Sequence, residues 1–209
     1  MSGTVHVVDD DASFRKAVER RLRKAGYDVV TYADARQLLD RLPDESQSGC
    51  ILLDVRMSGL SGPELQCRLS ELGLALPIIF LTGYADVRTT VQTIKAGAED
   101  YLTKPIASER LLWAIEQAIA HQSLLRRSRS KLDGLRSQIA LLTPRERQVF
   151  ELVVQGKMNK QIAVQLGATE RTIKAHRHNV MEKMQVHSLA ELVAIAERAG
   201  VLAEAENRV

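Results

Sequence analysis

The stretch Val5-His6-Val7-Val8-Asp9-Asp10-Asp11 joins a short apolar run to three consecutive carboxylates. Three later apolar runs also end on a reactive side chain: Ile51-Leu52-Leu53 before Asp54, Ile78-Ile79-Phe80-Leu81 before Thr82, and Tyr101-Leu102-Thr103 before Lys104. Runs this short, separated by segments of helical length, are typical of buried parallel strands. The carboxyl ends of such strands share one edge of an open α/β sheet, and ligands bind at that edge.

We therefore expect the side chains of Asp9, Asp10, Asp54, Thr82 and Lys104 to converge on one pocket. Three ionised carboxylates repel one another and need a compensating cation. Mg²⁺ (or Mn²⁺) is the expected ion, because it prefers oxygen ligands such as carboxylates. A carboxylate oxygen can also attack phosphorus and form an aspartyl-phosphate. Ordinary solvated acidic residues would explain Asp9 and Asp10 alone, but they explain the full set at four strand ends poorly.

Helical and strand patterns alternate through the first 120 residues. Helical spacing is found in Ser13–Lys24, Ala35–Leu42, Pro63–Leu72, Asp86–Ala96 and from Ala107 onward, and Tyr27–Tyr32 alternates as a further strand. Five strand–helix units in succession predict an α/β doubly wound, five-stranded parallel sheet.

The last of these helices shows no stop signal before Leu142. Leu125, Leu132 and Ile139 repeat at seven-residue spacing, with Leu135 and Leu142 three residues further on. The pattern predicts a long helical linker over 121–141. A short coiled-coil seam that pairs with a second copy and a single helix packed on its neighbours both agree with these few heptads.

A second unit is predicted over 142–202. Thr143 and Glu146 have the spacing of a capping box, with Pro144 at the first helical position. The further expected helix caps are Asn159, Thr169 and Ser188. Four short helices with Gly167 in the turn between the second and third predict an all-α helix-turn-helix domain.

Charge is distributed unevenly between the two halves. Residues 1–121 hold 14 Lys and Arg against 17 Asp and Glu, a net charge of −3, whereas residues 122–209 hold 15 against 9, a net charge of +6. A basic second half indicates a polyanionic partner for that half, although a solvated basic surface would give the same count.

No apolar stretch approaches the roughly 20 residues that a membrane-spanning helix needs. Cys50 and Cys67 stand apart and fit no metal-ligand spacing, which favours reduced structural thiols. The chain also shows no basic-then-apolar leader. We therefore expect a cytoplasmic protein with no membrane partner.

The first half resembles the receiver domain of two-component response regulators, a flavodoxin-like fold. The motifs that carry the resemblance over residues 3–120 are Val7-Val8-Asp9-Asp10, Leu53-Asp54, Leu81-Thr82-Gly83 and Tyr101-Leu102-Thr103-Lys104-Pro105. The resemblance implies that Asp54 accepts phosphate from a cognate sensor histidine kinase. It implies that Asp10, Asp54 and the backbone carbonyl of Arg56 bind Mg²⁺, with Asp9 assisting through water.

The same resemblance implies the parts of a conformational switch. Lys104 would pair with phosphoryl oxygens, Thr82 would hydrogen-bond one of them, and Tyr101 would turn inward when Thr82 moves. Pro105 would follow a cis peptide bond. Independently of the resemblance, this movement of Tyr101 should change the shape of the face formed by the fourth helix, fifth strand and fifth helix. We expect a symmetric dimer patch there. Its candidate surface residues are Arg88, Val91, Lys95, Leu111 and Ile115.

One position departs from the receiver pattern. The family usually has proline after the methionine at position 57, whereas this chain has Ser58. The loss of proline frees the backbone beside Asp54, so we expect a less rigid loop and an altered phosphate lifetime, with no ligand lost.

The third helix of the second unit has two distinct faces. On a helical projection Ile173, Val180 and Met184 lie on one side, and a donor-rich side that suits a DNA major groove lies opposite, formed by Arg171, Lys174, Ala175 and His178. Basic side chains placed to reach backbone phosphates are Arg145, Lys160, Arg177 and Lys183. A four-helix scaffold with a solvated basic face is the alternative.

Residues 138–202 resemble the LuxR/FixJ-type helix-turn-helix. The motifs are Leu142-Thr143-Pro144-Arg145-Glu146-Arg147, Asn159-Lys160-Gln161-Ile162-Ala163 and Thr172-Ile173-Lys174-Ala175-His176. The resemblance implies base-reading positions at Lys174, Ala175 and His178. It implies phosphate contacts at Asn159, Lys160 and Thr172, in addition to Arg177. Receiver, helical linker and this module in that order resemble FixJ-type regulators.

We therefore predict a transcription factor that is phosphorylated on Asp54, dimerises, binds double-stranded promoter DNA and acts with RNA polymerase, as an activator. We do not expect a turnover enzyme. A metal-dependent phosphohydrolase is the enzymatic alternative, but Arg56 stands where a second acid/base carboxylate would follow Asp54. A constitutive DNA binder, whose receiver mediates only protein contacts, is the other alternative.

Overall fold

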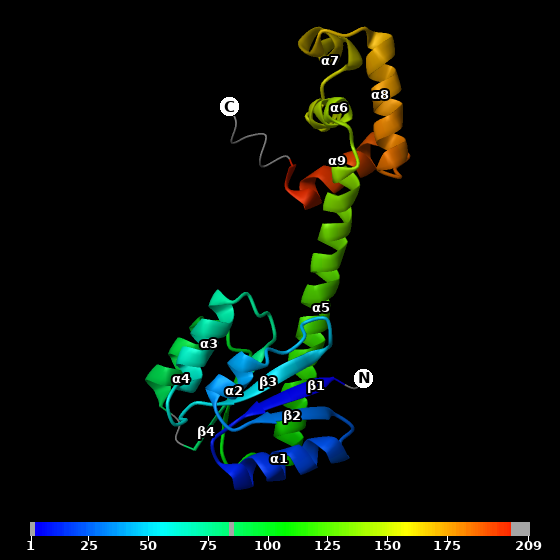
Figure 1. Cartoon of the computed structure of the whole chain (residues 1–209). Helices are drawn as coiled ribbons and strands as arrows, with labels where there is room; N and C mark the ends of the chain where they lie inside the picture. Colours follow the sequence, from blue (N-terminus) through cyan, green and yellow to red (C-terminus); the bar gives the residue numbers. More distant parts are fainter. Residues whose placement is uncertain (1–2, 84–85, 202–209) are drawn as a thin grey trace. The chain divides into compact units, whose positions relative to one another are not determined.

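The computed structural model describes residues 3–83 and 86–201 of the 209-residue chain. The chain divides into two compact units, with the boundary between Arg126 and Arg127. Helix α5, Ser108–Ala140, crosses this boundary without a break. Figure 1 traces the chain through both units.

The N-terminal unit is built on a five-stranded sheet. Its strands are β1 (Thr4–Val8), β2 (Asp28–Tyr32), β3 (Gly49–Asp54), β4 (Ile78–Thr82) and β5 (Asp100–Thr103). They pair in the order β2-β1-β3-β4-β5, and every pairing is parallel. This confirms the predicted doubly wound sheet. The order reverses between β1 and β3, which is where ligands bind in sheets of this kind.

Helices cover both faces of this sheet because the side chains of its central strands alternate between two apolar cores. In β3, Leu52 faces the core shared with helix α1 (Ala12–Lys24) and the first half of α5, whereas Leu53 faces the core shared with α2 (Ala35–Asp40) and α3 (Gly62–Glu71). Helix α4 (Val87–Lys95) lies beside α3, because Gln66 of α3 donates to the carbonyl oxygens of Thr93 and Ala96.

Two residues expected in the dimer patch belong to the core instead. Leu111 and Ile115 are fully buried on the side of α5 that faces the sheet, so their assignment to the surface was wrong. The helical period identified an apolar face of α5, and the larger part of that face is used to cover β1, β3 and β4. Val91 of α4, in contrast, is exposed as expected.

The seven-residue pattern along α5 serves different parts of the molecule. Leu125 is 57% exposed, whereas Ile139 and Leu142 are buried in the core of the C-terminal unit. The last two positions of the pattern are therefore accounted for by packing within that unit. Leu125, the first position of the pattern, keeps more than half of its apolar side chain exposed.

In the described part of the C-terminal unit, every regular element is a helix. Its helices are α6 (Pro144–Val154), α7 (Asn159–Leu166), α8 (Glu170–Lys183) and α9 (Leu189–Ala199). Helix α8 packs on α6 and α7 around a core that includes Phe150, Ile162 and Ile173. Gly167 ends α7 with φ of 60°, a left-handed conformation that glycine adopts without steric cost. The predicted helix-turn-helix is confirmed.

Three of the four predicted caps are present. Thr143 and Glu146 form the reciprocal capping box, while Thr169 and Ser188 accept backbone N–H groups of α8 and α9. The expectation for Asn159 was wrong: it is the first residue of α7, and the N-cap position is Met158. The Asn159 side chain instead accepts a hydrogen bond from Arg177.

Glu146 also joins the start of α6 to the end of α8. Its carboxylate lies 2.6 Å from Lys183 Nζ and accepts the Thr143 N–H at 2.9 Å. The hydrogen bond that Lys183 donates is the main cause, and the one that the Thr143 N–H donates is the second; together they lower the pKa of Glu146 from its ordinary 4.5 to about 2. Because the pKa is depressed in the folded state, this contribution to stability is complete above pH 4.5 and is lost as the pH falls toward 2.

We predict that Glu146→Gln destabilises the C-terminal unit by about 1–3 kcal/mol at pH 7. Glutamine keeps the capping acceptor but loses the charge that binds Lys183. The measurement is hydrogen exchange of α6 and α8 amides in the full chain between pH 2 and 7. The difference from wild type should shrink below pH 4.5. Glu151→Gln, on the same helix, is the matched control, and equal effects of the two changes would contradict the assignment.

Candidate functional site

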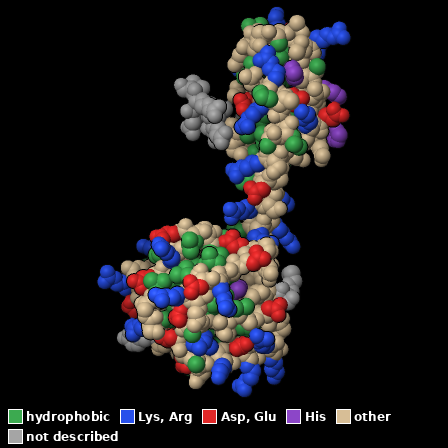
Figure 2. Space-filling view, viewed as in Figure 1, with side chains coloured by type: hydrophobic (Ala, Val, Ile, Leu, Met, Phe, Trp, Pro, Cys, Tyr) green, Lys and Arg blue, Asp and Glu red, His purple; other side chains and the backbone are tan. Residues whose placement is uncertain are grey.

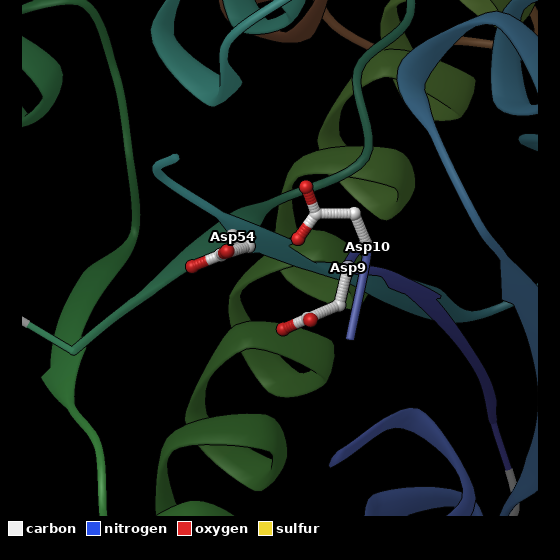
Figure 3. A group of neighbouring side chains, drawn as sticks. All are labelled: Asp9, Asp10 and Asp54. Atoms are coloured by element: carbon white, nitrogen blue, oxygen red, sulfur yellow. The ribbon is translucent and has the colours of Figure 1, made fainter. Parts of the chain in front are cut away.

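Three carboxylates meet at the carboxyl edge of the sheet. Asp9 follows β1 and Asp54 ends β3, and these strands are neighbours, so Asp9, Asp10 and Asp54 project from adjacent strand ends (Figure 3). One ligand oxygen of each lies within 4.8 Å of the others. Asp9 is fully buried and Asp54 is nearly so, whereas Asp10 is exposed. The structure thus brings together the three predicted metal ligands that act through side chains.

Lys104 supplies a cation between two of these carboxylates. Its Nζ lies 2.5 Å from Asp9 Oδ2 and 3.2 Å from Asp54 Oδ1. The Lys104 backbone N–H donates to the Thr82 carbonyl oxygen at 2.6 Å, which fixes the start of the lysine stem against the end of β4. The Lys104–Pro105 peptide bond is cis.

The environment of Asp54 disfavours its ionised form. Burial raises the pKa of this carboxyl above its ordinary value, Lys104 opposes that rise, and the negative charges of Asp9 and Asp10 add to it. Three carboxylates and one ammonium leave two uncompensated negative charges when all are ionised. A divalent cation would balance that charge, and carboxylate oxygens are the donors that hard cations prefer. The donor set therefore fits a hard divalent ion.

The remaining predicted site residues surround this cluster. Thr82 ends β4 and is buried, and Arg56 is exposed two residues beyond Asp54. Tyr101 of β5 is half-buried, and its ring centre lies 6.2 Å from that of Phe80. The Tyr101 hydroxyl is buried and has no hydrogen-bond partner among the described residues. A buried hydroxyl without a hydrogen bond is poorly stabilised. This agrees with a Tyr101 side chain that can adopt a second rotamer.

The sequence did not indicate several supporting contacts. Asp11 donates its backbone N–H to Asp9 Oδ1 at 2.9 Å and caps α1 with its own side chain, and Arg15 Nη1 donates to the Asp9 carbonyl oxygen. Lys104 Nζ lies 4.1 Å from the centre of the Phe14 ring. Phe14 lies four residues after Asp10 in a helical pattern. That spacing is the sequence feature that could have predicted its position near Lys104.

The loop after Asp54 is tied to the acidic cluster. The Ser58 backbone N–H donates to Asp10 Oδ2 at 2.9 Å. The sequence predicted only a loss of rigidity from the absent proline. In the structure the same absence leaves an N–H group that proline lacks, and this N–H joins the loop to Asp10.

Gly62 lets this loop return close to Asp54. A Cβ atom at position 62 would lie 2.3 Å from the Asp54 carbonyl oxygen and 3.0 Å from Phe80 Cε1. We predict that Gly62→Ala lowers the stability of the N-terminal unit by about 1–3 kcal/mol, because backbone must shift to admit the methyl group. The measurement is urea unfolding followed by the fluorescence of Trp113, the chain's one tryptophan, which lies in this unit.

Gly134→Ala is the matched control for Gly62→Ala. Among the described residues, no heavy atom outside the adjoining helix backbone and the two chain neighbours lies within 4 Å of a Cβ at position 134, which is in helix α5. The change there should be neutral or stabilising. Equal unfolding midpoints for Gly62→Ala and wild type would contradict the close approach.

The recognition face predicted on α8 is exposed. Lys174, Ala175 and His178 are exposed, while Ile173 and Val180 on the other side are buried. Lys160 of α7 is exposed as well. On the face of this unit in view, Lys, Arg and His side chains lie at the surface (Figure 2).

Several basic or polar groups near this face already have partners within the unit. Arg177 Nη1 donates to Asn159 Oδ1 at 3.2 Å, and the Thr172 hydroxyl lies 2.8 Å from that of Thr169. Arg145 donates to the Leu166 carbonyl oxygen, and Lys183 pairs with Glu146. Arg145 and Lys183 are therefore part of the scaffold, which the sequence pattern did not indicate.

Among the residues that the structure describes, no helix is both long and apolar enough to cross a membrane.

Comparison with known proteins covers both units. Residues 5–116 match the model of the response regulator receiver domain, and residues 140–196 match that of the bacterial regulatory proteins of the luxR family. The transcriptional regulatory protein FixJ of Bradyrhizobium diazoefficiens is 42% identical over 200 residues, which cover 96% of this chain and 97% of FixJ. Nodulation protein W of the same organism is 40% identical over 200 residues, covering 95% of this chain and 87% of that protein.

A solved structure extends the same likeness to the fold of both units. The response regulator StyR, solved at low resolution, aligns with a TM-score of 0.84 and 45% identity over 93% of this chain and 98% of StyR. The receiver match agrees with the acidic cluster at the carboxyl edge of the sheet, and the luxR-family match agrees with the exposed face of α8. The chain belongs to the FixJ-type transcriptional response regulators, which join a receiver domain to a LuxR-type DNA-binding domain.

Proposed function

We propose that Asp54 is the phosphoacceptor and that its phosphorylation controls DNA binding by the C-terminal unit. The observation that carries the proposal is the position of the buried Asp54 beside Lys104, with carboxylate oxygens of Asp9 and Asp10 within 4.8 Å of one of its own. An Asp54 oxygen attacks the phosphorus of a phosphohistidine on the cognate sensor kinase. The P–O bond to Asp54 forms, the P–N bond breaks, and the imidazole leaves with the electron pair and takes up a proton.

The residues around Asp54 have separate roles in this transfer. Asp10, Asp54 and the Arg56 carbonyl would hold Mg²⁺ (or Mn²⁺), with Asp9 assisting through water, and the ion would supply positive charge to the phosphoryl oxygens. Lys104 exchanges its contact with Asp54 for one with a phosphoryl oxygen, and Thr82 donates to another.

The phosphorylated receiver forms a homodimer. Movement of Thr82 frees space for Tyr101, whose buried hydroxyl has no hydrogen-bond partner in the described part of the chain, and the surface around α4 changes with it. Helix α4 carries three large exposed apolar side chains, Val87, Val91 and Ile94. Such a cluster on a receiver suits a self-complementary interface.

The dimer places two copies of α8 on the half-sites of a promoter operator. Lys174, Ala175 and His178 read bases, while Asn159, Lys160, Thr172 and Arg177 contact backbone phosphates. The protein acts in the cytoplasm as an activator together with RNA polymerase. It is not a turnover enzyme, since Arg56 rather than a second carboxylate follows two residues after Asp54.

The test is the intact mass of the full chain after incubation with acetyl phosphate, with and without Mg²⁺. We expect an adduct of one phosphoryl group that depends on Mg²⁺. Operator DNA fragments should then bind the phosphorylated protein more tightly. A chain that takes up no phosphate and binds DNA equally in both conditions would favour constitutive binding. Repeated release of phosphate from small phosphate esters would favour the phosphohydrolase alternative.

A further inference from the structure

Asp10 differs from the other two carboxylates in how it is held. Asp9 is buried, accepts the Asp11 N–H and pairs with Lys104, and Asp54 is buried and pairs with the same lysine. Asp10 is exposed, and among the described residues its side chain has one hydrogen-bond partner, the Ser58 backbone N–H. That bond joins positions 48 residues apart in the chain.

The bond holds the Asp10 carboxylate next to those of Asp9 and Asp54. The Ser58 N–H donates to Oδ2, while a ligand oxygen of Asp10 lies within 4.8 Å of those of Asp9 and Asp54. An exposed aspartate without this donor would sample several rotamers, and a metal would have to order it on binding. A carboxylate already held by a hydrogen bond loses less freedom when it coordinates an ion.

We propose that the Ser58 backbone amide is a positioning group for the divalent cation, holding Asp10 in its coordinating rotamer and thereby strengthening Mg²⁺ binding. The inference rests on the proposed phosphoacceptor site and adds a determinant of metal affinity that no side chain supplies. Proline at position 58 has no N–H and removes the bond, whereas alanine keeps it. The Ser58 hydroxyl takes no part.

The test is to titrate Mg²⁺ into three full-length proteins and to measure binding by calorimetry. The proteins are the wild type, Ser58→Pro and Ser58→Ala. Ser58→Pro is expected to weaken Mg²⁺ binding about 3–10-fold, at the low end of the effect of losing a group that supports a metal ligand. Ser58→Ala should stay within about twofold of wild type, since it keeps the donor. Equal Mg²⁺ affinity in all three proteins would overturn the proposal.

A second measurement separates the hydrogen bond from the stiffness that proline adds to the loop. In Ser58→Ala, the amide at position 58 should be protected from hydrogen exchange, and Asp10→Ala in the same background should remove that protection. If Asp10→Ala leaves the exchange rate of the amide at position 58 unchanged, the proposal is overturned whatever the calorimetry gives. If wild type binds no Mg²⁺ at all, the metal site itself fails, and with it the proposed phosphoacceptor chemistry.

Discussion

Asp54→Asn is expected to abolish both the phosphoryl adduct and phosphate-dependent dimerisation. The amide nitrogen and oxygen of asparagine keep the shape of the side chain, but neither is a carboxylate nucleophile that can form an acyl phosphate. Intact mass after incubation with acetyl phosphate and Mg²⁺ should show no adduct. Sedimentation velocity in the same mixture should show a monomer where the wild type shows a dimer.

The fold should survive this substitution. Burial raises the pKa of Asp54, so the ionised carboxylate is disfavoured in the folded state. A raised pKa means that the folded state binds its proton more tightly than the unfolded state, and the ionised group therefore lowers stability at neutral pH. Asparagine carries no such penalty. Without Mg²⁺, Asp54→Asn should unfold at an equal or higher temperature than wild type at pH 7, and the difference should vanish at pH values below 3.8, the carboxyl's ordinary pKa.

Asp40→Asn is the matched control, because Asp40 is an exposed residue of α2 outside the acidic cluster. It should take up phosphate and dimerise as wild type does. An adduct that persists in Asp54→Asn would place the acceptor elsewhere. Dimerisation that persists without an adduct would show that phosphodonor and oligomeric state are not linked through Asp54.

The elements of the sheet could be predicted because each strand is an apolar run that ends in a distinct side chain. Val5–Val8 and Ile51–Leu53 are buried on both faces, so their continuous apolar character was itself the signal. The convergence of Asp9, Asp54 and Lys104 followed from parallel strands alone. Tertiary contacts that depend on loop conformation left no such signal. The Ser58 N–H points at Asp10 because the loop returns to the sheet at Gly62, and the sequence pattern does not specify backbone direction.

Helix faces were predicted less well than strand ends. A helical period shows that α5 has an apolar side, but not how much of it the sheet covers, and Leu111 and Ile115 were therefore placed on the surface. The same limit applies to basic residues in the C-terminal unit. Arg145 and Lys183 carry the positive charge expected of phosphate contacts. In the structure, Arg145 donates to the Leu166 carbonyl oxygen and Lys183 pairs with Glu146. Charge counts do not distinguish a cation that stabilises the scaffold from one that is available to DNA.

Lys174→Ala and Lys160→Ala are expected to weaken DNA binding in different ways. Lys174 is exposed on α8 opposite the buried Ile173 and Val180, where a side chain enters the major groove. Its loss should cost about 1–3 kcal/mol on the preferred operator and relax the preference at one base position. Lys160 is exposed on α7, and its loss should weaken binding to all sequences alike and reduce the salt dependence by about one phosphate contact.

The measurement is the binding of the phosphorylated full chain to a set of operator variants at several salt concentrations. Arg198→Ala, at the end of α9, removes the same charge away from the predicted face and is the matched control. It should follow wild type in sequence preference. Because backbone phosphates are the same in every operator, only a base contact can change the ranking of operators. A ranking left unchanged by Lys174→Ala, or changed by Lys160→Ala, would mean that the base-reading face has been assigned to the wrong side of the helix-turn-helix.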